Sequence, residues 1–177
     1  MYSLEFTADE SIEQVIDKYA DMVYRLALAR TQNKYDAEDV FQNVFMRYFK
    51  KSPVFKDEEH QKAWLIRVTI NCSKSVFLSP WRRNTLPLED TLQTEDKEKN
   101  ELFQELNKLP PRYREVIHLF YYEDLSVAKI SEILHRKEST VRTQLTRARN
   151  ILKSFMKELC DNGGSIFFST HVLEVAE

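Results

Sequence analysis

The residues best suited to chemistry lie in one segment near the C-terminal end, where arginines and threonines recur on one side of a helical pattern. The polar side carries Arg142, Thr143, Thr146, Arg147 and Arg149. Apolar residues recur on the opposite side at spacings of four, three, four and three: Val141, Leu145, Ala148, Leu152 and Phe155. With the shorter helical pattern that begins at Ser126, this predicts two helices joined by a tight turn. A helix that is apolar behind and rich in Arg and Thr in front suits a DNA major groove.

Individual roles follow from position on that helix. Arg142 lies in the first turns, where side chains reach base edges, and a bidentate Arg–guanine pair contributes about 1–3 kcal/mol of discrimination. Lys137, Arg147, Arg149 and Lys153 are expected on phosphates, which fix position without reading sequence. The competing interpretation is an ordinary helical hairpin whose cations are simply solvated.

A second polar face occurs in the middle of the chain. Arg67, Asn71, Lys74 and Ser75 share one side of a helical pattern whose other side carries Val68, Cys72 and Val76, and three further residues follow: Trp81, Arg82 and Arg83. Aromatic rings beside cations suit single-stranded nucleic acid, because bases stack on rings while cations hold the backbone. The alternative is a solvated helix face beside a buried Trp64.

A third cluster is acidic and has no recognisable catalytic geometry. Asp36, Glu38 and Asp39 open a helical pattern that continues through three more polar residues, Gln42, Asn43 and Arg47. Carboxylates at a helix start usually compensate the helix dipole. They could also form a docking surface for a basic partner.

The elements that would position these faces are all helical. Only two glycines occur, at 163–164, and the apolar periodicities are long. Ser11 and Gln14 predict a capping box for a helix over 11–31. Asp36 is expected to cap a second helix, with an apolar stripe that includes Phe49 and an end at 51–53. Asp57 is expected to cap a third, reaching about Leu78.

Composition divides the chain into two helical domains. Residues 1–84 are expected to share one core, and residues 85–100 form an acidic, polar linker. A second domain covers 101–159, with a short helix from Glu101, proline at the first turn of the next helix at Pro111, and Ser126 capping the one after it.

Bulk properties exclude several classes. The net charge is −2, but residues 136–157 carry seven bases against one acid, and residues 89–105 carry seven acids against two bases. Local fields therefore set the partners. The two cysteines have no metal-ligand spacing, so neither a metal nor a cofactor is expected, and Cys72 is expected to be a buried thiol. With no apolar leader and no run of 18 apolar residues, we expect no membrane insertion and a cytoplasmic location.

Four blocks together carry a family resemblance over about residues 10–157. They are DAEDVFQNVFMRYFK (36–50), AWLIRVTINCSKSVF (63–77), LPPRYREVIHLFYYEDLS (109–126) and ISEILHRKESTVRTQLTRARNILK (130–153). In this order they resemble bacterial RNA polymerase sigma factors of the sigma-70 family, extracytoplasmic-function (ECF) group. The resemblance implies a region 2 domain, a flexible linker and a region 4 helix-turn-helix domain. It implies no enzymatic activity, because catalysis belongs to the polymerase.

The resemblance also implies roles for individual positions. Asp39, Gln42, Asn43 and Arg47 fall on the surface that docks on the β′ clamp helices of core RNA polymerase. The segment that opens and reads the −10 promoter element covers Trp64, Arg67, Asn71 and Lys74, followed by Trp81, Arg82 and Arg83. Region 4 would read the −35 element and touch the β flap, through Arg142, Thr143, Gln144, Thr146, Arg147, Arg149 and Lys153. An anti-sigma factor is an expected partner.

Three features depart from the family pattern. His135 and Arg136 stand where the turn usually has a glycine and an apolar residue, and Ser139 replaces a further common glycine. Residues 160–177 are an atypical tail that resembles the switch-histidine stretch of ATP-binding cassette ATPases at 169–171. No phosphate-binding loop accompanies it, so no nucleotide site is expected. We interpret the tail as a fusion, a neighbouring-gene remnant or an artificial extension, with a regulatory appendage as the alternative.

The main rival interpretation of the chain is a stand-alone helix-turn-helix regulator that binds operators without core polymerase. Such a regulator needs neither the polar face of residues 36–50 nor the base-reading face around Asn71. The first domain therefore separates the two interpretations.

Overall fold

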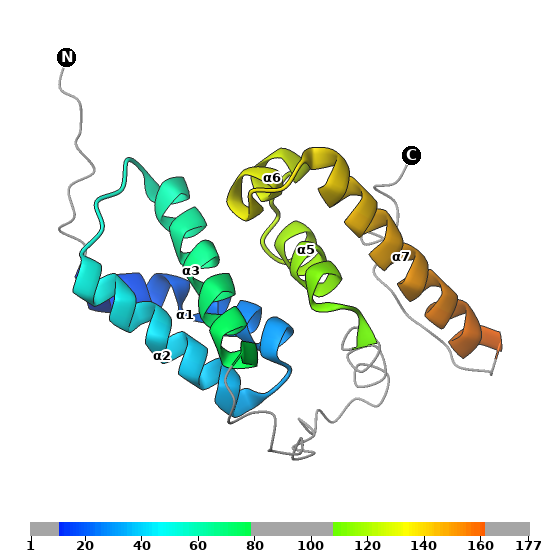
Figure 1. The fold of residues 1–177 in the computed structure, drawn as a ribbon, viewed down its shortest axis with the longest axis horizontal. Coiled ribbons are helices and arrows are strands. Elements are labelled where there is room, and N and C mark those ends of the chain that lie inside the picture. Colours follow the sequence, from blue (N-terminus) through cyan, green and yellow to red (C-terminus); the bar gives the residue numbers. More distant parts are fainter. Residues whose placement is uncertain (1–10, 79–107, 162–177) are drawn as a thin grey trace. The chain divides into compact units, whose positions relative to one another are not determined.

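The computed structural model describes residues 11–78 and 108–161, and these form six helices with no strand among them (Figure 1). They are α1 (Ile12–Thr31), α2 (Lys34–Lys51), α3 (Glu58–Leu78), α5 (Pro111–Tyr121), α6 (Val127–Leu134) and α7 (Glu138–Asp161). The expected all-α class with two helical domains is confirmed. The linker at 85–100, the short helix expected from Glu101 and most of the tail lie outside the described residues.

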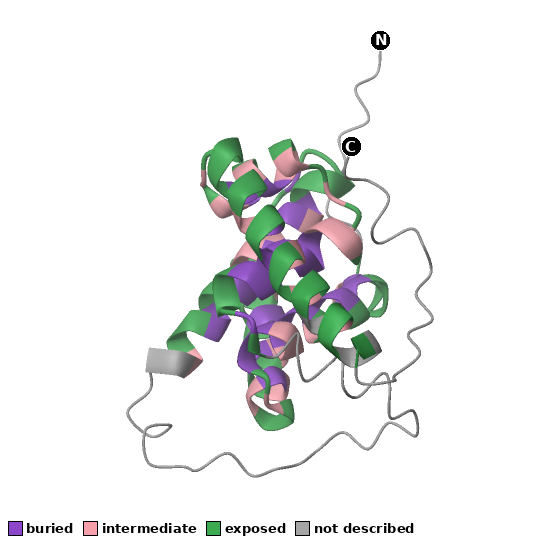
Figure 2. Ribbon diagram, turned by 90° about the vertical axis from the view of Figure 1, so that its right-hand side faces the viewer, coloured by how far each residue is buried: buried purple, intermediate pink, exposed green. Residues whose placement is uncertain are grey.

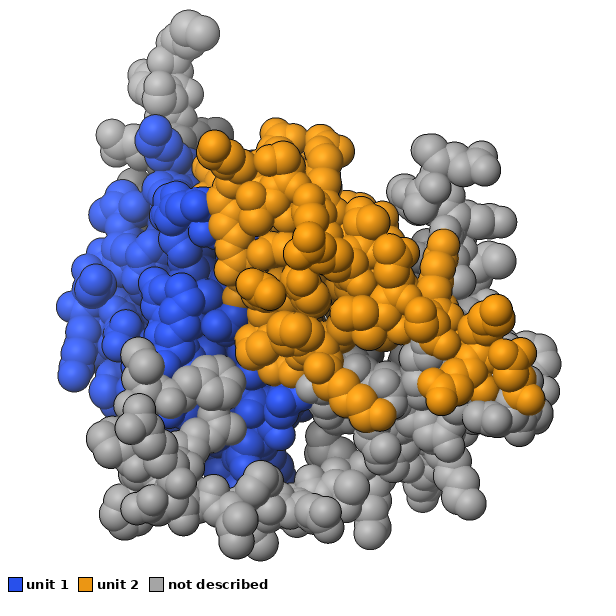
Figure 3. Space-filling view, turned by 45° about the vertical axis from the view of Figure 1, so that its right-hand side comes forward, with its two compact units in different colours: residues 1–89, 133–135 blue, residues 90–132, 136–177 orange. Residues whose placement is uncertain are grey.

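The chain divides into two compact units (Figure 3). Residues 1–89 and 133–135 are grouped in the first, and residues 90–132 and 136–177 in the second. Each unit builds its own apolar core, as expected for independent small domains.

The first unit is a bundle in which α1, α2 and α3 pack against one another. Its core is mostly aliphatic and forms where each helix turns one apolar stripe inward (Figure 2). Fully buried members include Val15, Val23, Leu26, Val40, Val44, Leu65 and Ile66. A buried amide also links the three helices: Gln61 on α3 accepts from the Tyr19 hydroxyl at 3.2 Å and donates to the Tyr48 hydroxyl at 3.0 Å.

Local capping largely follows the sequence. The Ser11–Gln14 capping box is present, and Asp57 accepts the His60 N–H at 2.7 Å. The expected Asp36 cap was wrong. Asn33 is the N-cap of α2, accepting the Asp36 N–H at 3.0 Å, and Asp36 lies in the first turn. The left-handed backbone of Gln32 ends α1 and leaves room for only one cap residue before α2 begins.

The second unit packs α5 against α7, with α6 between them in the chain. Pro111 is the first residue of α5, as predicted, and Pro110 is its N-cap. Ser126 accepts the Lys129 N–H at 3.2 Å and so caps α6. Residues of all three helices are buried in this unit: Val116 and Leu119 from α5, Ile130 from α6, and Val141, Leu145 and Ala148 from α7.

Candidate nucleic-acid interface

Helix α7 has the two-sided character that its sequence predicts. Val141, Leu145 and Ala148 are between 0% and 3% exposed. Four of the predicted contact residues are exposed on the remaining surface, namely Arg142, Thr143, Thr146 and Arg147, and so is Lys153 farther along the helix. Burial of one stripe fixes the rotation of α7, and this rotation presents the polar residues together.

The exposed side chains are partly pre-ordered by contacts within α7. Arg142 donates to Glu138 at 2.9 Å, one helical turn earlier, in an ion pair whose side chains are 65% and 48% exposed. The Thr143 and Thr146 hydroxyls donate to backbone carbonyls of the preceding turn at 2.8 Å and 3.0 Å. With those protons committed, each threonine offers a partner an acceptor oxygen and a methyl group.

A polar cleft of about 280 Å³ lies between the start of α5 and the first half of α7. Arg112 and Tyr113 line it from α5, and Ser139, Thr140, Thr143, Gln144 and Arg147 line it from α7. The hydrogen bond from Arg147 is the main cause that lowers the pKa of the Tyr113 hydroxyl, with burial opposing it and Arg112 adding to it. Two guanidinium groups beside a hydroxyl make the cleft attractive to an anion such as a phosphate.

Arg149 has a different environment from its neighbours. Its guanidinium lies over the rings of Phe120 and Tyr121 at 5.4 Å and 5.6 Å, and its Nε donates to the Tyr121 hydroxyl at 2.8 Å. These contacts join α7 to the C-terminal end of α5. The structure thus gives Arg149 a packing role that the sequence pattern, which grouped it with the DNA-contact candidates, did not reveal.

The turn between α6 and α7 accommodates the residues that depart from the family pattern. His135 is exposed and adopts a left-handed backbone with φ of 51°, the conformation for which glycine is usual. Arg136 is tied to Ser131 twice, through its backbone N–H at 3.0 Å and its carbonyl at 2.5 Å. Burial lowers the pKa of Arg136, and the charge of Arg112 adds to this effect.

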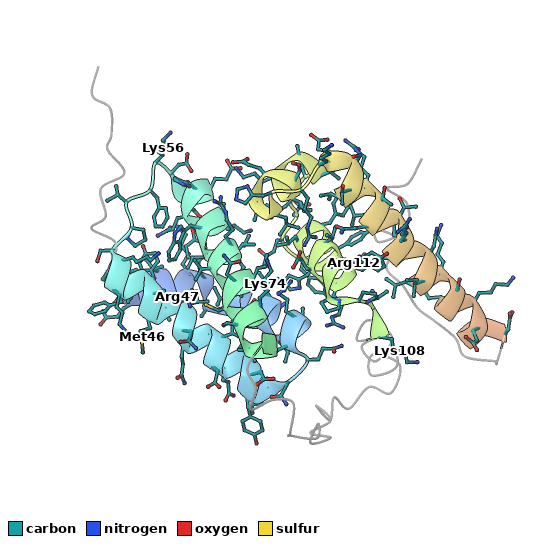
Figure 4. The ribbon with its side chains drawn as sticks, in the orientation of Figure 1. Met46, Arg47, Lys56, Lys74, Lys108 and Arg112 are labelled. Atoms are coloured by element: carbon teal, nitrogen blue, oxygen red, sulfur yellow. The ribbon has the colours of Figure 1, made fainter. Side chains whose placement is uncertain are left out.

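The candidate face on α3 combines packed and exposed residues. The Trp64 ring contacts Tyr48 and Phe55, at centroid distances of 5.8 Å and 5.9 Å, and is half-buried. Asn71 and Lys74 are exposed, and Lys74 is labelled in Figure 4. Arg67 is half-buried, and its Nε makes no hydrogen bond within the described part of the chain. Trp81, Arg82 and Arg83 lie outside the described residues.

Cys72, on the opposite side of α3, is 2% exposed, which confirms the expected buried thiol. Burial raises the pKa of this thiol, and the charge of Arg47 lowers it to a smaller extent.

The face on α2 is more apolar than the sequence analysis predicted. Asp39, Gln42, Asn43 and Arg47 are all exposed. Phe49, which the sequence placed in the core stripe, is 67% exposed, and Tyr35 and Met46 are 59% and 53% exposed. Figure 4 shows Met46 projecting from α2 on the side away from α3.

Residues 35, 39, 42, 46 and 49 are spaced four, three, four and three, so they form one exposed stripe, here called the α2 stripe. The spacing was available in the sequence. It was missed because α2 has a second, more apolar stripe that packs inward. A solvent-facing row of large apolar side chains marks an interaction surface.

No group of three or more His, Cys, Asp or Glu side chains is placed to share a metal ion within residues 11–78 and 108–161. In the same part of the chain, none of the helices is both long and apolar enough to span a bilayer.

Comparison with known proteins identifies the two units. Residues 15–85 match the profile of Sigma-70 region 2, and residues 99–152 match that of Sigma-70, region 4. SigE of Mycolicibacterium smegmatis, an ECF RNA polymerase sigma factor, is 30% identical over 163 residues, which cover 82% of this chain and 62% of SigE. SigW of Bacillus subtilis, also an ECF sigma factor, is 28% identical over 85% of this chain and 91% of SigW.

Solved structures show the same fold. The sigma factor RpoE in complex with the anti-sigma factor NepR, from Bartonella quintana, superimposes with a TM-score of 0.69 at 20% identity, covering 84% of this chain and 98% of RpoE. CnrH, in complex with the cytosolic domain of CnrY, has a TM-score of 0.63 at 19% identity, covering 83% and 88% of the two chains.

The fold and the two matched regions define the class as a two-domain RNA polymerase sigma factor. The chain belongs to the sigma-70 family, and within it to the ECF group.

The contacts of Arg149 predict a stability effect that its neighbours lack. Arg149→Ala removes two cation–π contacts and one hydrogen bond between α5 and α7, so we expect a loss of about 1–2 kcal/mol in the free energy of unfolding. Urea denaturation of the full chain, followed by circular dichroism, measures it. Arg142→Ala is the matched control, because its exposed ion pair contributes less than about 0.5 kcal/mol. Equal stability of the two variants would contradict the packing role.

Proposed function

We propose that this chain binds core RNA polymerase and directs it to promoters, with α3 acting at the −10 element and α7 at the −35 element. The observation that carries the proposal is the exposed Arg and Thr face of α7, held in one orientation by its buried stripe, within the part of the chain that matches region 4. The chain itself catalyses no reaction in this proposal, and it acts in the cytoplasm beside the polymerase.

The α2 stripe is proposed as the docking surface for the β′ clamp helices. Its polar members include Asp39 and Gln42, and Asn43 and Arg47 lie beside it, as the family resemblance implies. Its apolar members, Tyr35, Met46 and Phe49, supply the large buried area on which interface affinity usually depends. A surface with an aromatic anchor and a polar surround suits a helical protein partner better than it suits a nucleic acid.

The α3 face is proposed to hold the opened −10 strand. Asn71 is exposed and carries a side-chain amide, which can both donate to and accept from the edge of an unstacked base. Unstacking a base costs a few kcal/mol, and a protein contact that exists only with the flipped base offsets that cost. The half-buried Arg67 and the exposed Lys74 carry the positive charge that suits them to the backbone of the same strand.

The α7 face is proposed to read the −35 element. Arg142, with two N–H groups for guanine, and the methyl groups of Thr143 and Thr146, which suit thymine, are the base-reading candidates. Arg147, in the cleft with Arg112, and the exposed Lys153 are suited to phosphates. Gln144 lines the same cleft. Arg149 holds α7 against α5 through its contacts with Phe120 and Tyr121.

Two protein partners complete the proposal. Region 4 would touch the β flap while it reads DNA. An anti-sigma factor is expected, because RpoE and CnrH were each solved with a second protein, NepR and the cytosolic domain of CnrY.

Dependence on core polymerase separates this function from that of a stand-alone regulator. We expect core-dependent initiation in run-off transcription from a pool of promoters with randomised −35 and −10 elements. Phe49→Glu places a charge in the α2 stripe, so the affinity for core, measured without DNA, should fall by roughly tenfold or more, as for loss of an interface anchor. Val54→Glu, at a 78% exposed position outside the stripe, is the control and should bind normally. Failure to initiate on any promoter of the pool would favour the regulator.

Arg142→Ala should weaken binding to the selected −35 element by about 1–3 kcal/mol and relax the base preference at one position. Lys153→Ala is the comparison, because loss of a phosphate contact weakens binding to all sequences alike. Competition binding with the selected and a scrambled −35 duplex measures both. An equal loss for Arg142→Ala on the two duplexes would make it a phosphate contact.

Asn71→Ala should impair promoter opening more than closed-complex binding, because the amide meets its base only after the base is unstacked. Permanganate reactivity of unpaired thymines measures opening, and gel-shift at low temperature measures the closed complex. Opening at the rate of the unmodified chain would rule out a base-reading role for Asn71.

A further inference from the structure

Arg136, at the turn between α6 and α7, connects three parts of the second unit. One end of its guanidinium, Nη2, lies 2.6 Å from the Glu115 carboxylate on α5. The other end, Nη1, donates to the Gln144 side-chain carbonyl, Oε1, at 3.1 Å. The backbone of the same residue is bound to Ser131 on α6 through two hydrogen bonds. The guanidinium is therefore fixed from several directions.

The burial of Glu115 distinguishes this ion pair from a solvent-exposed one. Its side chain is 1% exposed and that of Arg136 is 26% exposed, so the ion pair is largely shielded from solvent. A buried carboxylate strongly favours retention of a counter-charge, since desolvation of an ion without one is costly. Glu115 thus holds the guanidinium in the position from which it reaches Gln144.

The contact fixes the orientation of the Gln144 amide and reduces its capacity to accept hydrogen bonds from DNA. A guanidinium can only donate, so the Gln144 atom that faces it is the carbonyl oxygen, and the amide nitrogen is left as a donor. Glutamine recognises adenine by accepting from N6 and donating to N7 at the same time. Arg136 occupies one of the two lone pairs of Oε1 and fixes the orientation of the amide, so Gln144 cannot turn freely to match the adenine edge and the bidentate pair is disfavoured. Guanine and thymine, which offer the acceptors O6, N7 and O4, are favoured instead.

Gln144 is placed to exercise such a preference. It is half-buried and lines the cleft with Thr143 and Arg147, both exposed on the face proposed to read DNA. We propose that Arg136 is a specificity-determining positioning residue, which presents Gln144 to the −35 element as a hydrogen-bond donor and selects against adenine at one position. This inference rests on the proposed function of α7.

The test uses the full chain with core polymerase and a pool of duplexes whose −35 element is randomised. Gln144→Ala first identifies the position whose base preference Gln144 sets. The double variant Glu115→Gln, Arg136→Met then removes the bond to Gln144 without leaving a buried carboxylate beside an apolar side chain. We expect the frequency of adenine at that position to rise about five- to tenfold, the lower part of the range for one well-made base contact.

Glu115→Gln alone is the matched control, because the glutamine amide oxygen can still accept from Arg136 Nη2 and so keep the guanidinium beside Gln144. This variant should keep the original preference. Arg136→Lys is a second route to the same result if the double variant melts below the assay temperature. A single ammonium keeps the charge beside Glu115 but does not reproduce a two-ended guanidinium, so the same rise in adenine is expected.

Three results would overturn the proposal. These are no change at any position in Gln144→Ala, an unchanged preference in both Arg136 variants, or an equal shift in Glu115→Gln alone. The last would attribute the effect to α5 packing and not to the Arg136–Gln144 bond. A holoenzyme of the unmodified chain that selects no −35 sequence at all would instead refute the proposed function, so the two failures are distinguishable.

Discussion

The burial of the apolar stripe of α7 is the constraint on which the DNA-facing surface depends. Val141, Leu145 and Ala148 are excluded from solvent, and burial of the two larger side chains, Val141 and Leu145, stabilises the unit by roughly 1.5–3 kcal/mol each. A helix fixed in rotation on one side presents a fixed set of residues on the other. The same logic applies to α2, where Val40 and Val44 are fully buried and the α2 stripe is presented outward.

Polar contacts fix the rotation of the helices more precisely than apolar packing does. Apolar contacts tolerate small rotations, whereas a hydrogen bond weakens steeply as its geometry departs from the optimum. In the first unit Gln61 joins α1 and α2 through two tyrosine hydroxyls. In the second unit Arg149 secures α7 to the end of α5, and Arg114 donates to the Leu109 carbonyl at 2.7 Å, where burial lowers its pKa to about 10.

The features that the sequence predicted well are those set by local periodicity and capping. Ser11, Asp57, Pro111 and Ser126 act at helix starts because a cap depends on atoms within a few residues of itself. The prediction that Asp36 caps α2 was wrong for an equally local reason. Asn33 is an equally good cap, and the left-handed turn at Gln32 decides between the two residues.

Tertiary contacts account for what the sequence could not reveal. Phe49 and Phe45 lie four residues apart on α2, yet Phe49 is 67% exposed and Phe45 only 5%. In the sequence nothing distinguishes Arg149 from the neighbouring cations, and its packing role is visible only when the structure places its guanidinium over the rings of Phe120 and Tyr121. Gln144 likewise appeared among the contact candidates without any sign that Arg136, eight residues earlier, binds its carbonyl. For Arg149 and Gln144 the deciding partner comes from packing that no local pattern encodes.

The turn between α6 and α7 shows how tertiary contacts can compensate for the absence of a preferred turn residue. A left-handed backbone costs a residue with a side chain about 1–2 kcal/mol relative to glycine, and His135 bears that cost. Arg136 then makes a charge-assisted hydrogen bond to Gln144 and a buried ion pair with Glu115, and one hydrogen bond to a charged group contributes about 1.5–3 kcal/mol. The two terms are of similar size. A turn that lacks the usual glycine and apolar residue can therefore keep its geometry, provided that the guanidinium is anchored at both ends.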